Sequence, residues 1–165
     1  MENQPSKLDK PRPGLGIIVL KEGNEVLVGK RKDCGLYGIP GGYLEKYESW
    51  EEGAVRELKE EVDLTVDVNK IYTVQVYNAC DKSKNYHNVA IVLVCEYPEG
   101  QEVKRMEPEK CEGWEWWKLE DLEKRVDELF WPNRQLVEQF KEKLKPEYLR
   151  SVLANPPKYK SCFFN

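Results

Sequence analysis

One helical segment constrains the fold of this chain more than any other part of its sequence. Ser49 is followed by Glu52 three residues later, which is the pattern of a capping box at the start of a helix. The apolar residues that follow recur at helical spacing and form one stripe: Ala54, Val55, Leu58 and Val62. The sequence therefore predicts an amphipathic helix over residues 49–62 that packs one face on a core.

Strand-like segments lie on both sides of this helix. Runs of apolar and β-branched residues bounded by polar turns predict strands at residues 14–20, 25–32, 64–80, 86–97 and 111–119. Helical spacing returns near the C-terminus, at residues 119–126 and 133–144. This order of elements predicts an α/β fold with a mixed sheet.

A chain of 165 residues suits one domain with a single core. Residues 1–12 are polar and contain prolines, so we expect a flexible arm there. The domain is expected to span residues 13–145. Residues 146–165 form a tail that ends near two phenylalanines, and exposed apolar groups usually dock, so we expect it to pack on the domain or on a second subunit.

Charge and composition limit the possible partners. The net charge of −4 and the pI of about 5.3 argue against a long nucleic acid, because phosphate backbones favour a basic surface. The N-terminus lacks the apolar stretch of a signal peptide, and the longest apolar run is too short to span a bilayer. Five cysteines without a CxxC pair suggest reduced thiols and a cytoplasmic location.

Three carboxylates on the predicted helix need an explanation. Glu57, Glu60 and Glu61 project from one side of it, and neighbouring like charges repel by roughly 0.2–0.5 kcal/mol per pair. Alone, they could be a solvated face. However, a Gly-Gly turn precedes them, and carboxylate oxygens suit hard divalent cations such as Mg²⁺, which completes its shell with water and substrate phosphates. The spacing therefore favours a metal site for a phosphate-containing ligand.

The same stretch, "GYLEKYESWEEGAVRELKEEVDL" at residues 42–64, resembles the Nudix box. The matching polar positions are Gly42, Glu48, Arg56, Glu57, Glu60 and Glu61. Asp63 stands where the family usually has a glycine at the helix exit, and aspartate also tolerates the left-handed conformation. Further segments, including "IPGGYLE", "EPEKCEGWEW" and "LFWPN", resemble the MutT-like nucleoside-triphosphate diphosphatases of eukaryotes.

This resemblance implies an α/β/α sandwich and the hydrolysis of a nucleoside diphosphate linked to another group. For a modified nucleoside triphosphate the products would be the monophosphate and pyrophosphate, as in sanitation of the nucleotide pool. By resemblance, Glu57, Glu60 and Glu61 hold Mg²⁺, with Mn²⁺ as an alternative, and the Gly42 carbonyl adds a ligand. Arg56 would orient a carboxylate, and Glu48 would lie behind the ligands. One of these glutamates can accept the proton from water, and the sequence does not identify which one.

Substrate selection must come from residues outside the box. Trp131 is the expected stacking surface for a base, although many tryptophans are simply interior. Asn133 can offer a donor and an acceptor to a base edge, whereas Gly38 stands where purine-binding relatives often carry an amide. Arg31 is expected to contact phosphate, with a solvated strand end as the alternative, and Gly41 completes the predicted substrate-binding set.

Other candidates have weaker support. Glu115 could be a further metal ligand, and His87 is expected to be structural. The remaining tryptophans are expected in the core or at an interface: Trp50, Trp114, Trp116 and Trp117. The habit of the relatives and the apolar tail predict a homodimer.

Two other classes of function remain open at this point. One is a Nudix hydrolase of a different small molecule or end group: an isoprenoid diphosphate, a capped RNA end or a dinucleoside polyphosphate. The other is a nucleotide-binding module that has lost turnover, which the intact acidic residues disfavour.

Overall fold

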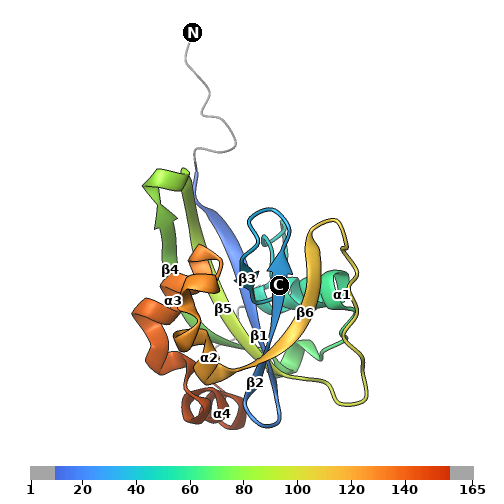
Figure 1. Cartoon of the computed structure of the whole chain (residues 1–165). Coiled ribbons are helices and arrows are strands. Elements are labelled where there is room, and N and C mark those ends of the chain that lie inside the picture. Colours follow the sequence, from blue (N-terminus) through green and yellow to red (C-terminus); the bar gives the residue numbers. More distant parts are fainter. Residues whose placement is uncertain (1–9, 157–165) are drawn as a thin grey trace.

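A mixed sheet of six strands forms the centre of the fold (Figure 1). The structure is a computed structural model, and it describes residues 10–156. Its strands are β1 (Arg12–Lys21), β2 (Glu25–Arg31), β3 (Tyr37–Gly38), β4 (Tyr72–Asp81), β5 (Tyr86–Glu96) and β6 (Cys111–Lys118). Its α-helices are α1 (Trp50–Val62), α2 (Leu119–Lys124), α3 (Trp131–Phe140) and α4 (Pro146–Ala154). Short 3₁₀ turns are η1 (Val68–Lys70), η2 (Lys82–Lys84), η3 (Val126–Glu128) and η4 (Lys141–Leu144).

The strand order is β3-β2-β1-β5-β4, and β6 pairs with β2. Strands β1 and β5 run parallel and pair from Arg12–Asn88 to Leu20–Glu96, whereas the other pairs are antiparallel. Strands β1 and β2 pair only at Leu20–Val26 and Lys21–Glu25, beside their turn. Beyond these two pairs the strands separate, and the sheet opens between them.

Helices cover both faces of the sheet, as Figure 1 shows with α1 on one side and α2, α3 and α4 on the other. Alternate residues of β1 enter opposite cores: Ile17 and Val19 pack on the α1 side, and Ile18 and Leu20 on the α3 side. The predicted α/β/α sandwich with a mixed sheet is confirmed.

Helix α1 begins at the predicted capping box. The Ser49 hydroxyl accepts a hydrogen bond from the Glu52 amide at 3.1 Å, and the Glu52 carboxylate accepts one from the Ser49 amide at 2.7 Å. Leu58 is fully buried in the core below the helix. At the other end Asp63 adopts the left-handed conformation, with φ of 56°, and pairs with Lys104 at 2.6 Å. The aspartate therefore serves as the helix cap that a glycine usually provides.

Two segments differ from the sequence-based prediction. Residues 64–80 were expected as one strand, but β4 starts only at Tyr72, so the first part of that prediction is wrong. There the Asp67 side chain accepts a hydrogen bond from the Asn69 amide and starts η1. Helix α4 was not predicted, and its Leu149 and Val152 pack in the core on the α3 side.

Part of the predicted ends of the chain lies outside the described residues. This applies to residues 1–9 of the arm and to residues 157–165, which include Cys162 and the two phenylalanines. The four described cysteines, Cys34, Cys80, Cys95 and Cys111, form no disulfide with one another.

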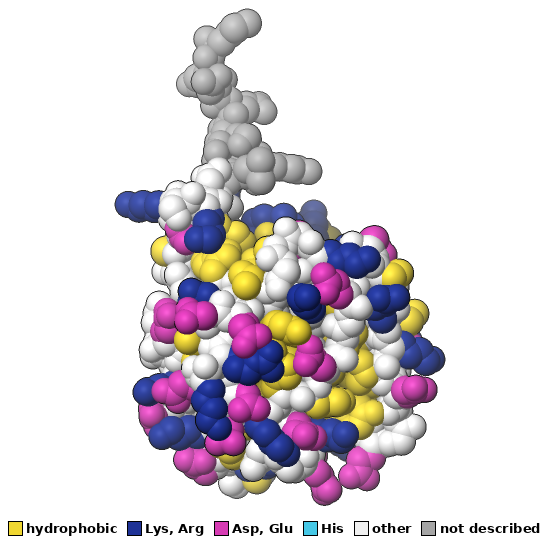
Figure 2. All heavy atoms as spheres, in the orientation of Figure 1, with side chains coloured by type: hydrophobic (Ala, Val, Ile, Leu, Met, Phe, Trp, Pro, Cys, Tyr) yellow, Lys and Arg dark blue, Asp and Glu magenta, His cyan; other side chains and the backbone are white. Residues whose placement is uncertain are grey.

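The surface shown in Figure 2 carries basic and acidic side chains interspersed, without a continuous basic field. No helix within residues 10–156 is both long enough and apolar enough to cross a membrane.

Candidate active site

A cavity of about 610 Å³ opens on the α3 side of the sheet. Its floor comes from β1 and β5, where Gly14 and Gly16 lie beside Ala90 and Val92 in the paired register. Most of these side chains are small, so the helices on this face leave a hollow above them. Residues Phe130, Pro132 and Asn133, at the start of α3, line another side of it.

The Gly-Gly loop fills the opening between β1 and β2. Two β1 amides hold it in place: Leu15 donates to the Gly42 carbonyl at 2.7 Å, and Ile17 donates to the Pro40 carbonyl at 2.8 Å. The Gly41 amide in turn donates to the Glu61 carboxylate at 2.9 Å. Through this opening, an acid of α1, on one face of the sheet, reaches the cavity on the other face.

Gly41 sits at a position that admits no side chain. Its φ is 156°, and a Cβ there would lie 2.0 Å from the Leu15 carbonyl oxygen. Replacement of Gly41 by alanine should therefore displace the loop and lower the free energy of unfolding by about 1–3 kcal/mol, as overpacking does. Urea unfolding would measure this change. Gly35 is a matched control, because it also has a positive φ of 71° but nothing lies within 4 Å of its Cβ position; an equal loss in both alanine variants would refute the clash.

Two carboxylates lie partly or fully buried beside this loop. Glu57 is only 8% exposed, and burial is the main cause that raises its pKa. Burial also raises the pKa of Glu61 to about 8, with further contributions from the charges of Glu57 and Glu107 and an opposing one from the Gly41 amide. Such a cluster favours the binding of a cation, because a positive charge offsets both the repulsion and the loss of hydration.

Arg56 connects the acids of the box. Its guanidinium donates two hydrogen bonds to Glu48, at 2.6 and 3.1 Å, and one to Glu57 at 2.7 Å. It also reaches Glu60 at 3.2 Å and the Tyr43 carbonyl at 3.0 Å. The hydrogen bonds between Arg56 and Glu48 lower the pKa of Glu48 and raise the pKa of Arg56. Arg56 therefore holds the loop before α1 against the helix and fixes the Glu57 carboxylate.

The oxygen atoms of this cluster suit a hard divalent cation, although they do not converge on one point in this structure. Within residues 10–156 no three His, Cys, Asp or Glu side chains are arranged to hold a metal ion as they stand. Arg56 engages Glu57 and Glu60, and the Gly42 carbonyl, which has two lone pairs, already accepts the Leu15 amide. The atoms that could coordinate a metal here are nevertheless carboxylate or carbonyl oxygens, which Mg²⁺ prefers.

The predicted substrate-binding residues lie around the cavity, with one exception. Arg31 lines it, pairs with Asp33 at 2.6 Å, and stacks its guanidinium 4.2 Å from the centre of the Phe130 ring. Asn133 lines it too, and its Oδ1 lies 2.9 Å from where a Cβ on Gly38 would be. The asparagine thus occupies space that a side chain at position 38 would use.

Trp131 is the exception, because it does not line the cavity. It packs edge-on against Tyr86, with ring centres 4.1 Å apart, and the aromatic side chain of this turn that lines the cavity is Phe130. The exposed His87 is absent from the lining as well. Glu115 accepts a hydrogen bond from the Trp117 indole at 3.1 Å and is not part of the cavity wall, so the geometry does not support a role as metal ligand.

The remaining tryptophans pack against the hydrophobic cores, as predicted. Trp117 is buried on the α3 side, and Trp50, Trp114 and Trp116 pack on the α1 side.

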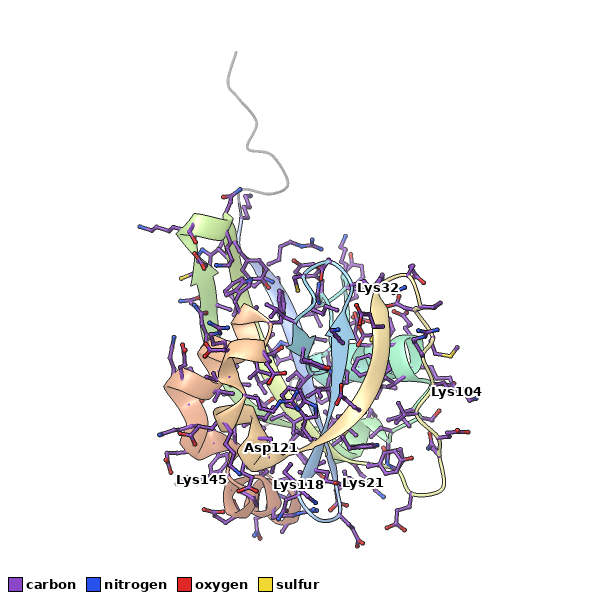
Figure 3. All side chains as sticks on the ribbon, viewed as in Figure 1. Lys21, Lys32, Lys104, Lys118, Asp121 and Lys145 are labelled. Carbon is purple, nitrogen blue, oxygen red and sulfur yellow. The ribbon has the colours of Figure 1, made fainter. Side chains whose placement is uncertain are left out.

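Sequence analysis missed several residues that line the cavity: Phe130, Tyr86, Asn88, Glu107 and Lys110. Tyr86 and Asn88 could have been found from the alternation of β5, which puts them on the face of Ala90 and Val92. Glu107 and Lys110 lie in the "EPEK" segment and form a 2.6 Å ion pair. Figure 3 labels Lys32, which lies beyond the end of β2 and lines the cavity, and Lys104, which lies on the loop before β6 and does not line it.

Comparison with known proteins gives a consistent result. The family model described as the NUDIX domain matches residues 10–140. An ADP-ribose pyrophosphatase of Methanocaldococcus jannaschii is 33% identical over 86 residues, which is 50% of this chain and 50% of that protein. A Bacillus subtilis protein, provisionally named an 8-oxo-dGTP diphosphatase, is 50% identical over 48 residues, or 29% of this chain and 32% of that protein. The chain thus spans about half, or less, of the length of these relatives.

A solved structure also matches. The MutT NUDIX hydrolase of Burkholderia pseudomallei superposes with a TM-score of 0.65 at 26% identity, over 79% of this chain and 98% of that one. These matches do not distinguish between branches of the family, so the eukaryotic branch named above stays a prediction.

Proposed function

The chain belongs to the NUDIX family, and on that basis we propose that it hydrolyses a nucleoside triphosphate, with an ordinary or a modified base, to the monophosphate and pyrophosphate. The observation that carries this proposal is a single cavity with two chemically different ends. Glu61, Gly41 and Gly42 line one end, and Phe130, Pro132 and Asn133 line the other. The first end suits phosphates held through a cation, and the second suits a flat polar base.

Members of this family generally use a divalent cation, most often Mg²⁺. We propose that Glu57, Glu60 and Glu61 hold it, and that the Gly42 carbonyl contributes. A bound Mg²⁺ would neutralise phosphate charge and lower the pKa of coordinated water. Hydrogen bonds hold these carboxylates in place. The Gly41 amide donates to Glu61, and Arg56 donates to both Glu48 and Glu57.

The nucleoside would lie over the floor formed by β1 and β5. A cavity of 610 Å³ falls within the usual range for small-molecule sites. The Arg31 guanidinium lies over the Phe130 ring at the base end and would give a base a cationic surface, while Asn133 would offer its amide to the base edge. Trp131 supports this end from behind the cavity wall, where its ring packs against Phe130 and Tyr86.

ADP-ribose is the second candidate substrate, because the archaeal relative is named for its hydrolysis. It contains the same nucleoside and diphosphate groups, so the same cavity can accept part of it. An isoprenoid diphosphate fits less well, because its apolar tail would cover the Asn133 amide and the Asn88 carbonyl oxygen without forming hydrogen bonds to them.

A substrate panel tests this proposal. Purified protein with Mg²⁺ would be incubated with ordinary and 8-oxo nucleoside triphosphates, ADP-ribose, a dinucleoside polyphosphate, capped RNA and an isoprenoid diphosphate, and the products separated by ion-exchange chromatography. We expect monophosphate and pyrophosphate from at least one triphosphate. Cleavage of ADP-ribose alone would select the second candidate. Release of phosphate from the isoprenoid alone would exclude a nucleotide substrate.

The homodimer and the cytoplasmic location remain parts of the same proposal. Sedimentation at micromolar concentration should give a species of twice the 19.4 kDa chain mass. A single species at the chain mass would refute the dimer.

A further inference from the structure

Tyr86 and Asn88 form a polar pair on the floor of the cavity that the roles above leave unused. The two residues are separated by one position on β5, so their side chains share a face, and both line the cavity. The Asn88 amide donates a hydrogen bond to the Tyr86 hydroxyl, and the edge of Trp131 holds the Tyr86 ring. Asn88 is only 7% exposed, so packing restricts the orientation of its side chain.

This pair retains unused hydrogen-bonding capacity. Within the described part of the chain, the Asn88 carbonyl oxygen accepts no hydrogen bond, and the Tyr86 hydroxyl donates none. Once the two side chains bind each other, at least one donor and one acceptor remain: the Tyr86 hydroxyl hydrogen and the Asn88 carbonyl oxygen. Exchanging the amide oxygen and nitrogen would leave the same pair of functions. Both groups face the cavity, and a ligand that fills the cavity displaces the water from them, so a ligand that supplies both an acceptor and a donor would complete this site.

The position of the pair corresponds to the middle of a nucleotide. A Cβ on Gly14 would lie 3.4 Å from the Asn88 amide nitrogen and 4.0 Å from the Gly42 carbonyl oxygen, so the pair adjoins the loop at the phosphate end. On its other side Tyr86 contacts Trp131, which in turn lies against Phe130 at the base end, with ring centres 6.0 Å apart. In a nucleotide the sugar lies between the phosphates and the base.

We propose that Tyr86 and Asn88 bind the sugar hydroxyls of the substrate and make the enzyme prefer ribonucleotides to 2′-deoxyribonucleotides. This inference rests on the proposed nucleotide hydrolysis. A ribose presents two adjacent hydroxyls and can satisfy both free groups. A 2′-deoxyribose presents only one and leaves a buried group without a partner, and sites of this kind discriminate strongly against the analogue that lacks the hydroxyl.

The test compares kcat/KM for GTP and dGTP, and for ATP and dATP, in the wild type and two variants. We expect the wild type to prefer the ribonucleotide of each cleaved pair at least about tenfold. In Tyr86→Phe and Asn88→Leu the ratio should fall toward one, mainly because the ribonucleotide is cleaved less efficiently. Tyr86→Phe keeps the ring against Trp131, so it tests the hydroxyl even if Asn88→Leu folds poorly. Asn133→Ala is the matched control, because it should change the ranking of bases and leave the sugar ratio as in the wild type.

The outcomes separate the two proposals. A wild type that cleaves nucleotides without a ribose preference, or a preference that survives in both variants, overturns the role of the pair and leaves nucleotide hydrolysis standing. A wild type that cleaves none of the four nucleotides, nor any other nucleotide of the panel, overturns the proposed function, and the sugar site with it.

Discussion

Replacement of Glu61 by glutamine should reduce turnover roughly 10²–10⁴-fold while the protein stays folded. The change removes a negative oxygen from the acid cluster, and with it either a ligand of the cation or a group that accepts the proton of water. Glutamine has nearly the same volume, and its carbonyl oxygen can still accept the Gly41 amide that glutamate now accepts at 2.9 Å. The measurement is kcat with saturating Mg²⁺, with the melting temperature as a check on folding.

Two controls separate this effect from a general change of charge. Glu138→Gln neutralises an exposed acid on α3 and should leave kcat unchanged. Complete chelation of divalent ions should abolish turnover by the wild type, and added Mg²⁺ should restore it. Wild-type turnover in the Glu61→Gln variant, or in the presence of excess chelator, would sink the proposal of metal-dependent catalysis at this cluster.

Replacement of Arg56 by alanine should lower the free energy of unfolding by roughly 2–4 kcal/mol in the absence of metal. Removing one partner from a mostly buried ion pair leaves the other charge uncompensated, and this typically costs about 3–5 kcal/mol. The Arg56 side chain is 21% exposed, so we expect a loss somewhat smaller than for a fully buried pair. The alanine variant would leave Glu48 and Glu57 unpaired, and the loop before α1 would lose the bond to the Tyr43 carbonyl.

Urea unfolding of Arg56→Ala and Arg56→Lys gives the comparison. Lysine keeps the charge but cannot form the forked contact with Glu48 while it also reaches Glu57, so its loss should be intermediate. Added Mg²⁺ should recover part of the loss, because a bound cation would replace the missing positive charge. A loss below about 0.5 kcal/mol in the alanine variant would show that the guanidinium network contributes little to stability.

The parts of this fold that follow from local patterns were predictable from the sequence. The capping box fixed the start of α1, and its apolar stripe fixed the buried face. The apolar runs of β1, β2 and β5 gave the centre of the sheet. The break before β4 was missed because residues 64–80 are rich in β-branched residues, whereas the turn there depends on a single Asp67 side-chain bond. Helix α4 was missed because it is short and its helical character depends on packing in the core.

The acids of the candidate site were predictable because they are close in sequence, whereas Arg31 and Asn133 were expected only from the family resemblance. Glu57, Glu60 and Glu61 follow from helical spacing, and Arg56 from its place beside them. No pattern in "LFWPN" tells which aromatic ring of the turn enters the cavity, and the structure puts Phe130 there while Trp131 packs behind Tyr86. That difference depends on the direction from which α3 approaches the sheet, which a sequence motif does not record.

The opening between β1 and β2 has a consequence for how this protein could diversify. The acids belong to a helix on one face of the sheet, and the surfaces proposed to select the substrate belong to strands and a helix start on the other. The two groups share few neighbours apart from the glycine loop, so substitutions at Asn133 and at Glu61 should combine almost additively in their effects on binding. Selection could therefore exchange one substrate for another by altering a single face, while the acid cluster is inherited unchanged.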